Sequence, residues 1–114
     1  MTGKSVDLTN LREMIGDDRE AENQLFEAFF EGAEGCLDGM TQGLDTEDNE
    51  LWRKSAHSFK GISRNLGAYI LGDLCLAAQE NFTCNSEQKK KLLKTIRDEY
   101  ANVESYLKGL MEPQ

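Results

Sequence analysis

The residues best suited to chemistry lie in one short stretch around His57, which is the only histidine of the chain. On a helix that turns about 100° per residue, four cations and a glycine lie within about 60° of His57: Arg53, Lys54, Lys60, Gly61 and Arg64. The opposite side, roughly 120–220° away, carries mainly apolar residues: Leu51, Trp52, Ser55, Phe59, Ile62 and Leu66. The spacing therefore predicts an imidazole that faces solvent, beside positive charge and beside a position without a side chain. That setting suits a histidine that carries an anion.

Two ordinary interpretations of this histidine compete with the anion carrier. A histidine satisfied inside the core is disfavoured, because His57 points away from the apolar stripe. A solvated histidine on a helix of mixed charge is an open alternative, because charged helical faces are usually exposed to water without any further role.

A neutral imidazole can act as a nucleophile and carry a phosphoryl group on a ring nitrogen. Catalysis of phosphoryl transfer consists mostly of positioning and charge neutralisation. Lys60, one turn from His57, is placed to neutralise the phosphoryl oxygens, and Gly61 leaves room for the group and its donor. Arg53 and Arg64 extend the positive charge. Because the chain shows no nucleotide-binding motif and no acidic metal pocket, we expect another protein to donate the phosphoryl group and to supply Mg²⁺.

Other kinds of site do not fit these residues. Di-iron bundles place a glutamate three residues before a histidine, but Lys54 occupies that position. One histidine and scattered cysteines do not make a zinc site. Ser58 lies about 100° round the helix from His57, which makes it a poor partner for a nucleophilic dyad. We therefore expect no metal and no cofactor bound by this chain itself.

The composition predicts a single helical domain over residues 1–114. The chain carries a net charge of −8, 30% of its residues are charged, and proline occurs once. A chain of this size can bury roughly two thirds of its surface, which is enough for a real core. So acidic a chain, whose basic patch has no interleaved aromatic residues, is not expected to bind nucleic acid.

The charge is unevenly distributed along the chain. Residues 1–50 hold fourteen acids and three bases, a net charge of −11, whereas residues 51–114 hold seven acids and ten bases, a net charge of +3. Four bases and no acid occur between Leu51 and Gly72. His57 therefore lies in a basic segment of an acidic protein.

Neither a membrane segment nor a disulfide framework is expected. No apolar run approaches the ~18 residues of a membrane span, and the N-terminus shows no signal-peptide pattern. The three cysteines contain no CxxC pair, and their odd number argues against a disulfide framework. We expect a cytoplasmic protein in which Cys36, Cys75 and Cys84 are reduced and act as small apolar residues.

Hydrophobic periodicity predicts helices separated by short breaks. A short helix over about 7–15 ends near Gly16, and Asp17 or Asp18 can cap the next helix. That helix carries apolar residues at three- to four-residue spacing, together with four recurring glycines: Gly32, Gly35, Gly39 and Gly43. The glycine row is compatible with close packing of another helix or with a break in this one.

The helix that carries His57 is expected to be capped by Asp45 or Thr46 and to run to about Asn65. Gly67 then favours a left-handed stop. A fourth helix over about 68–82 repeats five small or apolar residues: Leu71, Leu74, Cys75, Ala78 and Phe82.

Asn85 and Gln88 have the spacing of a capping box at the start of the last helix. The apolar stripe of that helix is Leu92, Ile96, Tyr100, Val103, Leu107 and Leu110. Four amphipathic helices with short connections predict an all-α fold, an antiparallel four-helix bundle with a short additional N-terminal helix.

The stretch around the histidine reads Ala56-His57-Ser58-Phe59-Lys60-Gly61-Ile62-Ser63-Arg64-Asn65-Leu66-Gly67-Ala68. It resembles the signature of histidine-containing phosphotransfer (HPt) domains, helical bundles that shuttle phosphate in multistep two-component relays. Alanine before the histidine, lysine and glycine three and four residues after it, and the closing Leu-Gly-Ala carry the resemblance. The resemblance implies that His57 is phosphorylated, that Lys60 assists by its charge and that Gly61 gives steric access.

The resemblance also bears on the edges of the motif. The following helix of the family often carries a leucine-rich stretch that ends in Leu-Glu, and Gln79 stands at the glutamate position here. Gln79 is therefore not expected to play an ionic supporting role. Arg64 stands where the family usually has a small residue, which we interpret as a determinant of partner choice. Arg53, Arg64 and Gln79 are expected at the binding surface.

The implied function is that of a monomeric phosphocarrier, not an enzyme in its own right, which moves a phosphoryl group between the aspartates of two receiver domains. Receiver domains of response regulators or of hybrid sensor histidine kinases are the implied partners, and they would supply Mg²⁺ and most of the catalysis. Two alternatives stay open. One is an adaptor bundle that binds a receiver or a kinase without being phosphorylated. The other is a piece of a larger hybrid kinase, although Met1 and the compact length favour a free protein.

Overall fold

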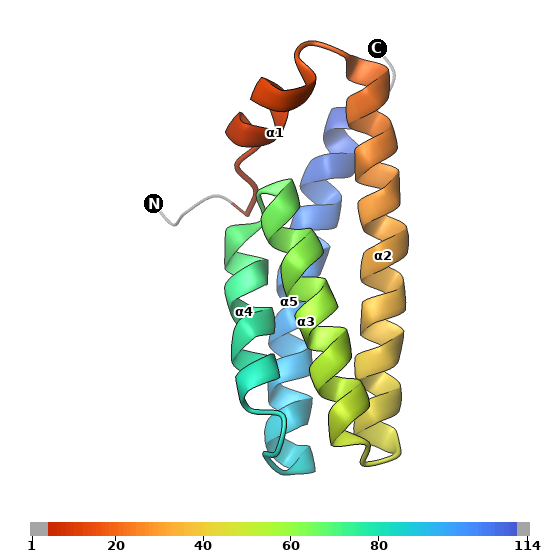
Figure 1. Ribbon diagram of the computed structural model, residues 1–114, viewed down its shortest axis with the longest axis vertical. Helices are drawn as coiled ribbons and strands as arrows, with labels where there is room; N and C mark the ends of the chain where they lie inside the picture. Colours follow the sequence, from red (N-terminus) through yellow and green to blue (C-terminus); the bar gives the residue numbers. More distant parts are fainter. Residues whose placement is uncertain (1–4, 112–114) are drawn as a thin grey trace.

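Five helices form an elongated bundle in the computed structural model, which describes residues 5–111. In chain order they are α1 (Thr9–Ile15), α2 (Arg19–Asp45), α3 (Asn49–Leu66), α4 (Tyr69–Glu80) and α5 (Ser86–Met111). The four longer helices alternate in direction, and α1 lies at one end of the bundle (Figure 1). No strand occurs within residues 5–111, so the predicted antiparallel four-helix bundle with a short additional N-terminal helix is confirmed. Across the same residues, every helix is too short or too polar to cross a bilayer.

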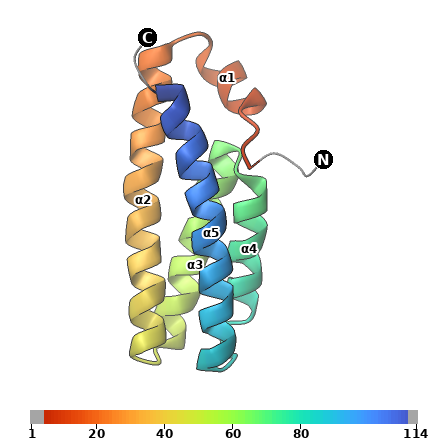
Figure 2. The ribbon, with the colours of Figure 1, turned by 180° about the vertical axis from the view of Figure 1, so that it is seen from behind.

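The position of α3 in the bundle leaves one of its faces open. α3 packs between α2 and α4, and α5 packs against α2 and α4 on the other side. Figure 2, seen from behind, shows α5 in front of α3. The face of α3 that points away from α5 is therefore the face that a partner protein can reach.

Buried contacts fix the rotation of α3 about its own axis. Phe59 packs edge-on against Tyr100 of α5, with the ring centroids 6.0 Å apart. The indole nitrogen of Trp52 donates a hydrogen bond of 2.9 Å to the backbone oxygen of Ala78 in α4. The largest fully buried side chains come from all four long helices: Trp52, Phe26, Phe59, Met40, Leu71, Ile96 and Leu107. Large side chains in a close-packed core tolerate little displacement. α3 is therefore held in one orientation about its axis, and this orientation decides which of its residues face solvent.

The glycine row of α2 packs against α3 and does not break α2, which continues to Asp45. A methyl group would press against α3 at three of the four positions: Gly32, Gly39 and Gly43. At Gly43 it would lie 2.8 Å from the backbone nitrogen of Trp52, closer than real packing allows. At Gly35 it would meet nothing within 4 Å. Close helix packing is therefore the correct interpretation of this row.

The N-terminus of α3 is capped by Asp48, whose carboxylate accepts a hydrogen bond of 3.0 Å from the backbone nitrogen of Leu51. The expectation that Asp45 or Thr46 caps this helix is wrong. Asp45 is the last residue of α2, and Thr46 follows as its C-cap.

The caps of α2 and α5 agree with the sequence. Asp18, and not Asp17, caps α2 by accepting a hydrogen bond of 3.0 Å from the backbone nitrogen of Ala21. The side chain of Asn85 accepts a hydrogen bond of 2.9 Å from the backbone nitrogen of Gln88 at the start of α5. Both bonds satisfy backbone donors that the first turn of a helix leaves without a partner.

The N-terminal segment covers the turn between α3 and α4. Gly67 ends α3 in the predicted left-handed conformation, with φ of 106°. Its carbonyl accepts a hydrogen bond of 2.9 Å from the backbone nitrogen of Asp7. The carboxylate of Asp7 accepts hydrogen bonds from the backbone nitrogen and the hydroxyl of Thr9, at 3.0 and 2.7 Å. α1 therefore begins at Thr9, two residues later than expected.

The buried stripes of α4 and α5 differ from expectation at their edges. α4 buries three of the five expected residues: Leu71, Cys75 and Ala78. Leu74 is half-buried, and Phe82 lies beyond the end of α4. In α5, Leu93 is buried where Leu92 was the expected residue. The buried row continues from Ile96 toward the N-terminus through Leu93 to Lys89. Lys89 is therefore a charged residue at a position where helical periodicity predicts an apolar one.

Candidate functional site

His57 lies near the middle of α3 and is exposed. The opposite side of the helix is in the core, where Trp52, Ala56 and Phe59 are fully buried. The prediction that the imidazole points away from the apolar stripe is therefore confirmed, and a core histidine is excluded. Helical periodicity is enough to predict where the ring lies, because the apolar face of an amphipathic helix packs on the core and the opposite face is left exposed.

Gln79 of α4 fixes one nitrogen of the His57 ring. Its side-chain oxygen Oε1 lies 3.2 Å from Nδ1 of the imidazole. An amide oxygen can only accept a hydrogen bond, so this contact favours the tautomer in which Nδ1 carries the proton. The other nitrogen, Nε2, then has a free lone pair. The sequence-predicted binding residue Gln79 thus touches His57 directly, and its contact is a neutral hydrogen bond and not an ionic one.

Lys60 and Gly61 follow His57 by one turn on the same side of α3. The ammonium group of Lys60 forms no hydrogen bond and no ion pair with any residue of the described range 5–111. A methyl group at Gly61 would meet no heavy atom within 4 Å. One side of His57 therefore offers an uncommitted positive charge beside an open surface.

The two arginines of this face each pair with an acid. Arg53 pairs with Glu50 one turn before it, and Nε of Arg53 donates to a Glu50 oxygen at 3.0 Å. This hydrogen bond lowers the pKa of the Glu50 carboxyl and raises the pKa of Arg53. The Arg53 guanidinium also lies 5.9 Å from the centre of the Phe82 ring. Its charge is thus shared with Glu50 and the Phe82 ring.

Arg64 extends toward α4, where its guanidinium contacts Asp73 at 3.1 Å. Glu50 and Asp73 lie just outside the acid-free segment of the sequence. Glu50 could be identified from its i,i+3 spacing to Arg53. Asp73 could not, because its contact depends on how α4 packs against α3. Lys54 is exposed and, within the described part of the chain, has no ion-pair partner.

The cysteines take no part in this site. All three are free thiols, of which Cys75 is buried and Cys36 and Cys84 are half-buried. Burial, together with the neighbouring Cys36, raises the pKa of the Cys75 thiol to about 12. Burial also raises the pKa of Cys36. Thiols with raised pKa values are poor nucleophiles, in agreement with their predicted role as small apolar residues. Residues 5–111 contain no group of three histidine, cysteine or acidic side chains that could hold a metal ion.

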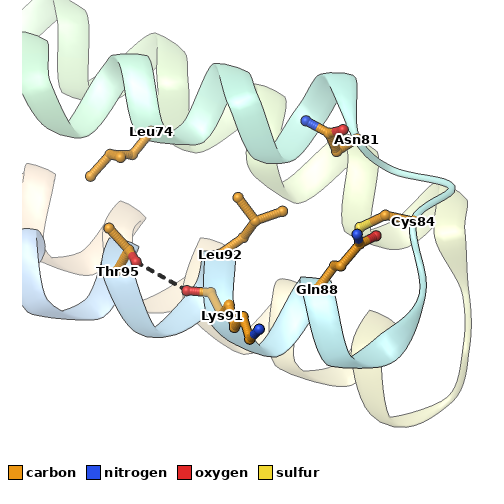
Figure 3. A pocket seen from close by; sticks show the side chains of 7 residues that line it. All are labelled: Leu74, Asn81, Cys84, Gln88, Lys91, Leu92 and Thr95. Carbon is orange, nitrogen blue, oxygen red and sulfur yellow. Dashed lines mark hydrogen bonds between the residues drawn. The ribbon is translucent and has the colours of Figure 1, made fainter.

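A hollow of about 480 Å³ between α4 and α5 is separate from the histidine (Figure 3). Leu74 and Leu92 point into it from the two helices, and polar residues from the connection and from α5 surround them. One of these, Thr95, uses its hydroxyl to donate a hydrogen bond of 3.1 Å to the backbone oxygen of Lys91. None of the residues around His57 lines this hollow.

Comparison with known proteins identifies relatives of this arrangement. A family model described as "Hpt domain" matches residues 24–106. The structure is similar to the crystal structure of histidine-containing phosphotransfer protein B (HptB) from Pseudomonas aeruginosa PAO1, with 27% sequence identity, 96% of each chain covered and a TM-score of 0.83. A search of curated protein sequences gives no match. The matched residues include the whole of α3 and α4, which together carry the His57 surface.

Proposed function

Because the chain belongs to the Hpt domain family, whose members transfer phosphoryl groups through a histidine in phosphorelays, we propose that His57 is the residue that becomes phosphorylated. His57 is the single histidine of the sequence. It is also exposed on the one face of α3 that the bundle leaves open. The contact between its Nδ1 and Gln79 is the observation that carries the assignment, because it favours the tautomer that a nucleophile needs.

The donor in this proposal is an aspartyl phosphate of a receiver domain. The lone pair on Nε2 of His57 attacks the phosphorus, so that a P–N bond forms as the P–O bond to the aspartate breaks. The aspartate leaves as a carboxylate. The ring keeps its proton on Nδ1 and gains positive charge, which the Gln79 oxygen, 3.2 Å away, stabilises as an acceptor. The reverse sequence of steps returns the phosphoryl group to a second receiver.

Lys60 and Gly61 serve the transferred group in different ways. A side chain on a helix leans toward the N-terminus and covers the preceding turn, so Lys60 reaches back toward the His57 ring. There its ammonium can neutralise charge on the phosphoryl oxygens. Gly61 leaves the surface beside the ring open, so the donor's active site can approach. Arg53 and Arg64 lie farther out and contribute to binding of the partner.

The partner supplies the remaining chemistry in this proposal. We assign the phosphoryl donor and acceptor to receiver domains of response regulators or hybrid sensor kinases. Mg²⁺ held by the receiver and most of the catalysis come from that side of the complex. The chain itself acts as a monomeric, cytoplasmic carrier without a cofactor of its own.

Phosphorylation of wild type and His57→Gln tests the assignment. Each protein is incubated with Mg²⁺ and a receiver domain that has been phosphorylated by acetyl phosphate. We expect label that is stable to alkali and labile to acid on the wild-type chain, as for a phosphohistidine, and none on His57→Gln. Circular dichroism controls for folding, which an exposed side chain should hardly affect. Label of equal amount on both proteins would refute the assignment, and tight receiver binding without any label would favour the adaptor.

A further inference from the structure

Arg64 is held in place by a notch in α4. Its side chain crosses Gly72, a buried glycine, so that a methyl group at Gly72 would lie 2.7 Å from Cγ and 3.5 Å from Cδ of Arg64. Any other residue at position 72 would occupy the path of the arginine stem. The absence of a side chain at Gly72 therefore decides where the guanidinium ends.

The guanidinium lies on Asp73, with Nη2 3.1 Å from a carboxylate oxygen. Both side chains are well exposed, 41% for Arg64 and 74% for Asp73. Exposed ion pairs are weak and exchange readily with other partners. Arginine also has five N–H donors, and the contact with Asp73 uses one of them. Arg64 is thus ordered by its stem, while its remaining donors have no hydrogen-bond partner among residues 5–111.

Arg64 lies on the same side of α3 as His57 and Gly61, seven residues beyond the histidine. At 1.5 Å per residue this is about 10 Å along the helix axis. Both side chains lean toward α4, His57 onto Gln79 and Arg64 onto Asp73. While its guanidinium stays on Asp73, we expect Arg64 to contact the docked protein and not the phosphoryl group on His57.

We propose that Arg64, positioned by Gly72 and Asp73, is a specificity-determining residue that binds a carboxylate on the surface of the docking receiver. The proposal rests on the proposed function, because it requires a receiver seated over His57. An ordered arginine loses less conformational freedom on binding than a free one, and it can form a bidentate pair with a carboxylate. A receiver with an acid at this point replaces Asp73, whereas a receiver without one leaves the pair as it is and gains nothing.

Transfer kinetics with three variants test the proposal. The probe is the phosphorylated receiver domain that exchanges phosphoryl groups fastest with the wild-type chain. Arg64→Ala is expected to raise the KM for this receiver about tenfold, with kcat within about twofold, because the residue binds the partner without touching the reacting atoms. Gly72→Ala keeps the arginine but displaces its stem, so its KM should rise to a similar value.

Asp73→Asn separates two effects of Asp73: it positions Arg64, and its negative charge competes with the receiver for the guanidinium. The amide oxygen can still accept a hydrogen bond from Arg64, but the competing negative charge is gone. We expect the KM to fall about threefold, with the same kcat. Arg97→Ala is the matched control, because it removes an exposed arginine from α5, where Arg97 bonds only the hydroxyl of Thr41 among the described residues. Its KM should equal that of wild type.

Unchanged KM for Arg64→Ala, with or without a lower unfolding temperature, would overturn the proposal and leave the arginine a structural link between α3 and α4. If Gly72→Ala fails to fold by circular dichroism, Arg64→Ala and Asp73→Asn decide, because opposite changes in KM are required of them. Failure of the wild-type chain to accept any label would instead overturn the phosphorylation of His57. The two failures are therefore distinguishable.

Discussion

The middle of α3, around His57, and the first turn of α3 are each next to a lysine, and the two lysines have opposite environments. Lys60 has no hydrogen-bond or ion-pair partner among residues 5–111. Lys89 of α5 is 5% exposed, and its ammonium donates hydrogen bonds to the side-chain oxygen of Asn49 at 2.5 Å and to the backbone oxygen of Cys84 at 3.1 Å. It also lies 5.7 Å from the centre of the Trp52 ring.

The difference shows how a cation becomes structural or functional. Lys89 holds the first turn of α5 against the first turn of α3, and its charge is satisfied by oxygen dipoles and an aromatic face. Lys60 holds no part of the fold together, so its charge is available to an incoming phosphoryl group. We infer that two features together mark the functional lysine: it has no partner among the described residues, and it lies one turn after His57. Lys54 also lacks an ion-pair partner within residues 5–111, but its side chain leans away from the histidine.

Removal of Lys89 should cause the larger loss of stability. Lys89→Ala deletes two charge-assisted hydrogen bonds and the contact with Trp52, so we expect the free energy of unfolding to fall by about 2 kcal/mol. Urea denaturation measures this loss. Lys90→Ala, at the exposed neighbouring position, is the matched control and should change stability by less than about 0.5 kcal/mol. Equal effects of the two substitutions would show that Lys89 has no structural role at the first turn of α3.

Removal of Lys60 should slow transfer without loss of stability. We expect Lys60→Ala to reduce the rate of phosphoryl transfer to His57 about tenfold, which corresponds to about 1.4 kcal/mol of transition-state stabilisation. Single-turnover transfer from a labelled receiver measures the effect. Lys54→Ala is the control, because that side chain leans away from His57 toward the preceding turn, and its effect should be under about threefold. If Lys60→Ala slowed transfer but also lowered the free energy of unfolding measured in urea, so that partial unfolding explained the slower rate, the functional role would be contradicted.

A single methyl group added at Gly61 should affect stability and transfer in opposite directions. Because nothing lies within 4 Å of an added methyl group, Gly61→Ala should raise the free energy of unfolding by up to about 1 kcal/mol through helix propensity. The same methyl group narrows access to His57, so we expect transfer to slow about threefold. Gly109→Ala in α5 is equally open and should leave transfer unchanged. Faster or unchanged transfer by Gly61→Ala would show that this glycine has no role in access.

Features that depend on one helix at a time could be predicted from the sequence. The outward position of His57, the stop at Gly67 and a cap at Asp17 or Asp18 all follow from local spacing, and the structure selects Asp18. The cap of α3 could not, because Asp45, Thr46 and Asp48 are all chemically able to cap a helix. The length of α2 selects among them. The resemblance to HPt domains rested on residues of α3 and of the turn that follows it, and the family match confirms it.

Features that join two helices were decided by the tertiary structure. Gln79 and Asp73 come from α4, and no periodicity in α3 or α4 says which residues of the two helices meet. Lys89 belongs to a run of three lysines that is typical of a solvated face, yet one of them is buried. The amino-acid order sets the direction of each side chain around its own helix, because every residue turns the backbone by about 100°. The register between helices depends instead on the packing of large side chains and glycines at their contacts, and that packing selects the neighbours of His57 and Arg64.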